Sequence, residues 1–191
     1  MALDINKVGN YNKKGFIGNS SAKPIVGVPL RGIYTFDLSQ GKLTGDDIIL
    51  PGEPVKAVNK LSNATGAVKV SNSNVLELSK PEAVAADISG FLLANDTDVI
   101  DFGQDAPRAY KGQIVNVALL GSRTEVYLPV EATVAGANVN KKLLWDFEKG
   151  CLKEDTTGTI ELLGPVVDGV KFKNTAGVIS YENFKVAKVR L

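Results

Sequence analysis

The stretch GQIVNVALLGSRTEVYLPVEATVAGANV, residues 112–139, decides the fold class. Apolar and β-branched residues dominate it, and glycines interrupt it at roughly even intervals. Two alternating apolar runs, residues 114–119 and 126–130, lie on either side of a turn around Gly121. Apolar residues at every second position, with turn-forming residues at both ends of the run, are typical of a β-strand. Two such runs joined by a short turn predict an antiparallel hairpin.

The segments that precede this stretch have the same pattern of short apolar runs and turn residues. Residues 25–38 and 46–58 are short apolar runs separated by Gly or Pro every few residues, which is typical of strands and turns. Pro51 and Pro54 favour edges, strand starts or turns. Residues 64–79 continue the pattern.

The C-terminal third of the sequence has the same pattern of short apolar runs separated by turn residues. LLWDFEKGCL, residues 143–152, predicts a second hairpin that turns near residues 148–150. Residues 159–172 and 176–191 predict further short strands. Turns are expected there at three glycines, namely Gly164, Gly169 and Gly177.

One segment has a helical signature. In SKPEAVAADISG, residues 79–90, Ser79 and Glu82 have the spacing of a capping box. Pro81 is tolerated in a first turn, and Gly90 lies beyond the expected end. The segment predicts one helix of about two turns.

The predicted fold is therefore mainly β, an antiparallel β-sandwich or β-barrel with at most one or two short helices. Residues 1–24 are rich in Asn, Gly, Ser and Lys without periodicity, and predict an extended N-terminal arm. Residues 25–191 are the expected β-rich body, and a small projecting subdomain is expected near residues 141–175.

The composition is that of a soluble globular protein. The 191 residues are 44% hydrophobic and 23% charged, with a net charge of +1. Basic runs do not exceed Lys pairs, so no nucleic-acid partner is expected. The charge is uneven, +4 over residues 1–32, −6 over 33–107 and +3 over 108–191. Attraction between copies and an ordinary mixed surface both explain this distribution.

The sequence contains neither a signal peptide nor a membrane-length apolar run, so we expect a protein made in a cytoplasm with no membrane partner. Histidine is absent, which removes Ser–His, Cys–His and His-ligated metal designs. Phosphate-binding glycine motifs are also absent. The single cysteine, Cys151, is interpreted as a small apolar filler. The expectation is a protein that is not an enzyme and has no cofactor.

Two groups of side chains are candidates for binding sites. Four aspartates cluster in one segment, Asp96, Asp98, Asp101 and Asp105. Their spacing departs from a calcium loop, which favours a solvent-facing acidic loop over a metal site. The alternating row of Leu143, Trp145 and Phe147 is expected to face a core.

Five phrases carry a family resemblance: NKVGNYNKKGFIGN (6–19), GEPVKAV (52–58), ISGFLLAND (88–96), YKGQIVNVALLGSRTEVYL (110–128) and AGVISYENFKVAKVRL (176–191). In this arrangement of a polar arm and glycine-led short strands, the chain resembles the head decoration, or structural cement, proteins of tailed bacteriophages. The resemblance implies a non-enzymatic virion protein that binds the outer surface of a capsid and stabilises it.

The implied partners are the major capsid protein and further copies of the chain, as a trimer or dimer. The implied location is the exterior of a virion, after synthesis in the host cytoplasm. Capsid contacts are expected in the basic N-terminal arm with its isolated apolar anchors, at Lys7, Lys13, Lys14 and Phe16.

Two alternatives stay open. A phage tail, baseplate or fibre-associated β module would have much the same composition. A carbohydrate-binding or carbohydrate-cleaving β-sandwich would use Trp145, Tyr110 and Tyr127 with carboxylates of the acidic segment at residues 96–105.

Overall fold

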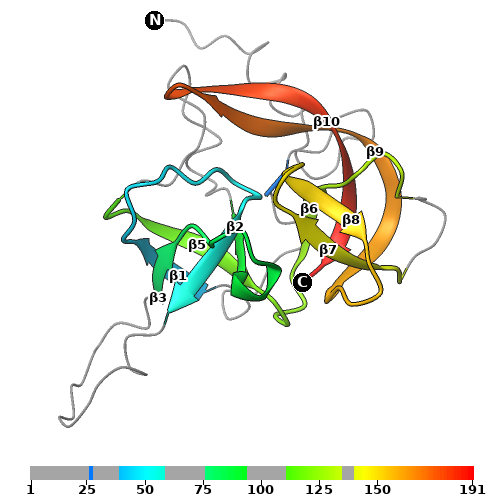
Figure 1. Ribbon diagram of the computed structural model, residues 1–191, viewed down its shortest axis with the longest axis horizontal. Helices are drawn as coiled ribbons and strands as arrows, with labels where there is room; N and C mark the ends of the chain where they lie inside the picture. Colours follow the sequence, from blue (N-terminus) through cyan, green and yellow to red (C-terminus); the bar gives the residue numbers. More distant parts are fainter. Residues whose placement is uncertain (1–25, 28–38, 59–75, 94–110, 135–139) are drawn as a thin grey trace, which may run out of the picture.

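The structure is a computed structural model that describes residues 26–27, 39–58, 76–93, 111–134 and 140–191. These residues are arranged as a closed β-barrel and a second, five-stranded sheet (Figure 1). Helical structure in this part of the chain is limited to one 3-10 turn, Ala85–Asp87. The predicted mainly β class, with at most one or two short helices, is confirmed. The arm boundary at residue 24 and the projecting subdomain stay predictions.

The barrel consists of β1 (Ser39–Leu43), β2 (Pro54–Val58), β3 (Leu76–Ser79), β4 (Gly90–Leu92) and β5 (Ile114–Leu119). Its strand order is β1-β3-β2-β4-β5, and the antiparallel pairing of β1 with β5 closes it. Only β1 and β3 pair in parallel. Each strand therefore has a neighbour on both sides, so the barrel has no open edge. A small core fills it, made of Leu43, Ile49, Val55, Leu78, Leu92, Val115 and Val117.

The second sheet consists of β6 (Glu125–Pro129), β7 (Lys142–Asp146), β8 (Cys151–Glu154), β9 (Ile160–Thr175) and β10 (Val178–Arg190). Its order is β6-β10-β9-β7-β8, which makes β6 and β8 the outer strands. These two strands approach each other, because Val130 and Leu152 form a parallel bridge and the Glu131 N–H donates to Leu152 O at 2.8 Å. The sheet thus curls toward closure.

The two sheets share one hydrophobic core. The main cluster of buried side chains includes Phe91 and Ala118 from the barrel together with Leu143 and Trp145 from the second sheet. The rings of Phe91 and Trp145 meet edge to face, with centroids 5.5 Å apart. Leu143 and Trp145 are buried and Phe147 packs against the cluster, so the predicted core-facing row is confirmed.

A two-residue segment, Val26–Gly27, is hydrogen-bonded to two strands of the second sheet and lies close to the turn before β2 of the barrel. The Val26 N–H donates to Val170 O of β9, and the Gly27 N–H donates to Tyr127 O of β6, both at 3.0 Å. Val26 is 1% exposed. Gly27 and Gly52 have φ values of 81° and 83°, and a Cβ on Gly27 would lie 2.6 Å from the Gly52 nitrogen. Only glycines fit this close approach of the barrel turn to the segment.

The helix predicted for residues 79–90 is wrong, apart from the short 3-10 turn. Ser79 ends β3 and pairs with Lys56, and the Ser89 N–H donates to Val55 O at 2.9 Å. The 3-10 turn has no side-chain cap. A helix of two turns gains few internal hydrogen bonds. Pairing across the barrel therefore determines both ends of the segment.

The predicted hairpin of residues 114–119 with 126–130 is also wrong. The turn at Gly121 exists, with φ 82°, but the strands on its two sides enter different sheets. β5 already has β4 and β1 as neighbours, so no edge is left for β6. The connection is held instead by long-range bonds, from the Leu120 N–H to Ser89 O and from the Arg123 N–H to Leu191 O, each 2.9 Å.

The second predicted hairpin is confirmed as β7–β8. The Asp146 carboxylate accepts hydrogen bonds from the N–H groups of Glu148 and Lys149, at 2.9 and 3.2 Å. These bonds hold the pKa of Asp146 below its ordinary value, and the bond from Lys149 has the largest effect. Gly150, with φ 60°, completes the turn before Cys151.

In the C-terminal tail, the turn predicted at Gly177 is confirmed and those at Gly164 and Gly169 are wrong. β9 runs through both glycines as a single strand of 16 residues. Residues 163–165 of β9 lie opposite the single residue Lys188 of β10, because the register shifts there. Gly and Pro inside a strand often accompany such a bulge. Here the sequence Gly-Pro therefore marks an irregular strand rather than its end.

The glycine contact gives a first prediction. Gly52→Ala is expected to lower the free energy of unfolding by about 3 kcal/mol, about 1 from its positive φ and about 2 from overpacking. The added Cβ would lie 1.9 Å from Cγ1 of Val26. Gly121→Ala is the matched control, because its φ is 82° and nothing lies within 4 Å of its Cβ. Urea denaturation measures both. Equal losses would contradict the close-approach argument.

Candidate functional site

β9 and β10 continue well past the sheet to which they belong. β6 pairs with β10 only over residues 186–190, and β7 pairs with β9 only over residues 160–161. Beyond these contacts the two long strands pair with each other as far as residues 175 and 178. We call residues 168–185 the β9–β10 ribbon, and in Figure 1 it crosses above the barrel. The ribbon therefore extends past the strands that flank it, although two of its side chains, Val170 and Phe172, are buried.

The end of the ribbon is a tight two-residue turn. Ala176 and Gly177 have φ values of 51° and 86°, as a type I′ turn requires. The Gly177 N–H donates to Oδ1 of Asn174 at 2.9 Å. The twist of such a turn matches the twist of the strands that it joins. The tip is therefore a defined structure built on two regular strands.

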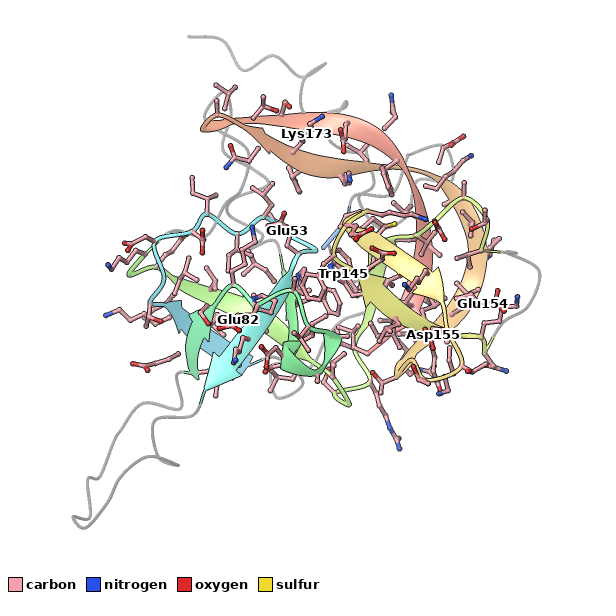
Figure 2. All side chains as sticks on the ribbon, in the orientation of Figure 1. Glu53, Glu82, Trp145, Glu154, Asp155 and Lys173 are labelled. Carbon is pink, nitrogen blue, oxygen red and sulfur yellow. The ribbon has the colours of Figure 1, made fainter. Side chains whose placement is uncertain are left out.

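Side chains brace one face of the ribbon. Lys171 lies 3.8 Å from the ring centroid of Phe184, and its ammonium is 3.0 Å from the Glu182 carboxylate. Lys173, labelled in Figure 2, is 3.4 Å from the same carboxylate. Burial opposes ionisation of Glu182, but the two lysines outweigh it and hold its pKa below the ordinary value. These cross-strand contacts favour a single conformation of the ribbon.

The tip carries an exposed apolar side chain. Val178 is 68% exposed, more than Val84 and Ile114, each at 54%, the other large exposed apolar residues of the described chain. Its neighbours Thr175, Ala176 and Gly177 are exposed as well. A rigid, exposed tip with an apolar residue is suited to contact a partner surface.

A groove of about 560 Å³ lies at the base of the ribbon. Two ion pairs are part of its lining, Lys149 with Glu131 and Lys185 with Asp168. Its lining residues are Val130, Glu131, Ala132, Lys149, Cys151, Asp168, Asn183, Phe184 and Lys185. Because the exposed lining is mostly apolar and its charged residues are paired with each other, the groove suits an apolar side chain better than a charged ligand.

Cys151 does not turn this groove into a reactive site. Burial, with the nearby Glu131 carboxylate, raises the pKa of the Cys151 thiol. A protonated thiol is a poor nucleophile. Cys151 is 1% exposed, which agrees with its interpretation as an apolar filler.

The residues predicted for function fall in different places. The capsid-contact residues Lys7, Lys13, Lys14 and Phe16 lie outside the described residues, as do Tyr110 and the aspartates of residues 96–105. The carbohydrate alternative fits poorly with what is described, because Trp145 belongs to the core and Tyr127 packs against it. The turn of the ribbon at Gly177 was predicted from the two alternating runs around it, but the length of the ribbon was not.

In the described residues, no group of three or more Asp, Glu, Cys or His side chains is placed to hold a metal ion. No helix of the same residues is long and apolar enough to cross a membrane.

Glu53 lies directly before β2, and its surroundings shift the pKa of its carboxyl group. Its carboxylate accepts a hydrogen bond from the Leu50 N–H at 2.8 Å, and in Figure 2 it lies on the side of the barrel nearest the ribbon. Burial raises the pKa of Glu53, and the Leu50 bond with the charges of Lys80 and Lys171 offsets only part of that effect. An ionised Glu53 is therefore a cost to the folded state at neutral pH.

This pKa predicts a pH dependence. The folded pKa of Glu53 lies above its ordinary 4.5, so its contribution to stability is complete below pH 4.5 and is lost as the pH rises through the folded pKa. Glu53→Gln keeps an oxygen for the Leu50 N–H. The variant is expected to gain stability relative to the natural protein as the pH rises from 4.5 to neutral, in urea denaturation at a series of pH values.

Glu182→Gln is the control with the opposite sign. The lowered pKa of Glu182 contributes stability above its ordinary 4.5, and this is lost as the pH falls through the folded pKa. Parallel pH profiles for the two variants would contradict the assignment of Glu53 as the desolvated carboxylate.

Comparison with known proteins assigns the chain to no family. No protein-family model matches it, and no curated protein is similar to it at a significant level.

Proposed function

We propose that this protein is a non-enzymatic structural protein that binds the outer surface of a bacteriophage capsid and stabilises it as a decoration protein. Five sequence segments that resemble those of phage head decoration proteins support the choice of this family. The β9–β10 ribbon supports the mode of action, because it extends past its pairing with β6 and β7 and ends in an exposed apolar tip.

The ribbon has the properties that docking to a fixed surface requires. Its base is held by β6 through residues 186–190 and by Val26 at Val170. Its length is braced by Lys171 and Glu182. A pre-organised arm loses little conformational freedom on binding, so more of its contact energy is available for affinity. In this proposal, Val178 is the apolar anchor that enters a depression of the capsid surface.

The N-terminal arm is the second contact in this proposal, through Lys7, Lys13, Lys14 and Phe16. The major capsid protein is the partner, and self-association into a trimer or dimer places several arms and ribbons around one symmetry axis. Contacts that are weak singly become strong together, because each bound element raises the effective concentration of the next.

Co-sedimentation tests the proposal. Purified protein is added to heads of the phage that encodes it after their decoration protein has been removed, and copies bound per head are counted against concentration. Saturation at a copy number compatible with icosahedral symmetry is expected. Binding to tails or baseplates instead of heads would replace the proposal with the tail-module alternative.

A pair of valine variants tests the ribbon. Val178→Asp is expected to weaken head binding about tenfold or more, because a buried interface anchor contributes more than about 1.4 kcal/mol. Val84→Asp is the matched control, since Val84 is also exposed but lies beside the barrel's 3-10 turn. Both variants should unfold at the temperature of the natural protein. Equal loss of binding in both would remove the ribbon from the proposed interface.

A further inference from the structure

The outer side of β10 changes its surroundings at the base of the ribbon. β6 pairs with β10 over residues 186–190, and the last bond on this side runs from the Val130 N–H to Lys185 O at 2.9 Å. Between Lys185 and the tip at Val178, no described strand pairs with this side of β10. The uncovered side of a strand at a sheet edge is a template for pairing with another chain.

The backbone groups along this edge have a defined direction. The Lys185 carbonyl points to the outer side, because it accepts a bond from Val130 there, and the groups that point to one side recur at every second residue. β9 and β10 pair in regular register from residue 178 to residue 187. Tyr181 therefore directs its N–H and C=O to the same outer side, where an antiparallel strand can bond to them.

The groove at the base of the ribbon lies at one end of this edge. Residues 183–185 of β10 line it, together with residues 130–132, where the chain leaves β6. Its four charged lining residues form two ion pairs, so the groove carries no net charge. A strand that follows the edge toward the base would bring its end to this groove, and an uncharged, apolar end would fit there.

The tip of the same ribbon has these properties. Residues 174–181, with the sequence NTAGVISY, contain no charged side chain, and Val178 is the most exposed large apolar residue of the described chain. In a two-fold dimer both copies use the same surface, so each copy must supply both parts of every contact. β10 meets this requirement, because it carries the apolar tip at one end of the edge and a wall of the groove at the other.

The register places tip and groove together. If two β10 strands lie antiparallel about an axis at Tyr181, Val178 of one copy lies opposite Phe184 of the other, because the two residues are equally far from the axis on its two sides. Val178 and Phe184 are separated by an even number of positions, so their side chains lie on the same face of the ribbon. Phe184 lines the groove.

We propose that the free protein forms a two-fold dimer in which the β10 edges pair antiparallel and Val178 of each copy enters the groove of the other. The two Tyr181 residues exchange backbone hydrogen bonds across the axis. One Val178 side chain cannot enter this groove and a capsid surface at the same time. The dimer is therefore the form of the protein away from a head, separate from the assembly proposed on a capsid, and the inference does not depend on the capsid proposal.

Sedimentation velocity of the full chain over a series of concentrations tests the dimer. A monomer–dimer equilibrium is expected. Val178→Asp should raise the dimer Kd at least tenfold, because it places a charge in an apolar groove. Ala132→Trp should have the same effect from the other side, because Ala132 is exposed and lines the groove, which the indole would fill. Val84→Asp, at the exposed valine beside the 3-10 turn, should dimerise as the natural protein does.

A cysteine on the axis tests the register. The Cα atoms of a hydrogen-bonded antiparallel pair are about 5.5 Å apart, a separation that a disulfide spans. Tyr181→Cys is therefore expected to give a covalent dimer on mild oxidation, while Cys151 takes no part because it is buried. Val84→Cys is the control for random collision and should stay monomeric on a non-reducing gel.

Three results would overturn the proposal: a monomer at every concentration, a trimer, or a dimer that neither Val178→Asp nor Ala132→Trp weakens. Absence of the covalent dimer with Tyr181→Cys would overturn the register. Ala132→Trp keeps Val178, so the capsid proposal expects it to bind heads as the natural protein does. Dimer formation and head co-sedimentation are separate measurements, and each proposal can fail without the other.

Discussion

The shared hydrophobic core is the constraint on which the rest of this structure depends. Phe91 of the barrel and Trp145 of the second sheet meet within it, and Val26 enters it from the N-terminal side. Because side chains of both sheets bury the same apolar surface, neither sheet can shift without exposing part of the other. The backbone contact of Gly27 with Gly52 then fixes the separation of the two sheets at one point.

Local pattern predicted the elements of this fold better than their partners. The β7–β8 hairpin and the buried row at Trp145 follow from contacts between residues near in sequence. The pairing of β5 and β6 did not, because two alternating runs look the same whether they pair with each other or with distant strands. Closure of the barrel by β1 and β4 occupies both edges of β5, and a short sequence window contains no information on that closure.

Some features of the candidate sites also had a local signal in the sequence, and others had none. The turn of the ribbon had a local signal in Ala176–Gly177, but the length of β9 was hidden by Gly164 and Gly169, which resemble turn residues. The groove at the base of the ribbon combines residues from distant elements, so no motif could reveal it. The predicted arm contacts are a different case, because they come from composition and stay predictions.

The pairing of β9 and β10 also determines how the molecule would respond to force. Both strands of the ribbon continue into the sheet, where residues 186–190 form five register pairs with β6. A load applied at the tip along the strand direction would act on these hydrogen bonds in shear, so that they resist together instead of opening one after another. The β9–β10 ribbon is thus a tether whose mechanical resistance comes from the sheet at its base.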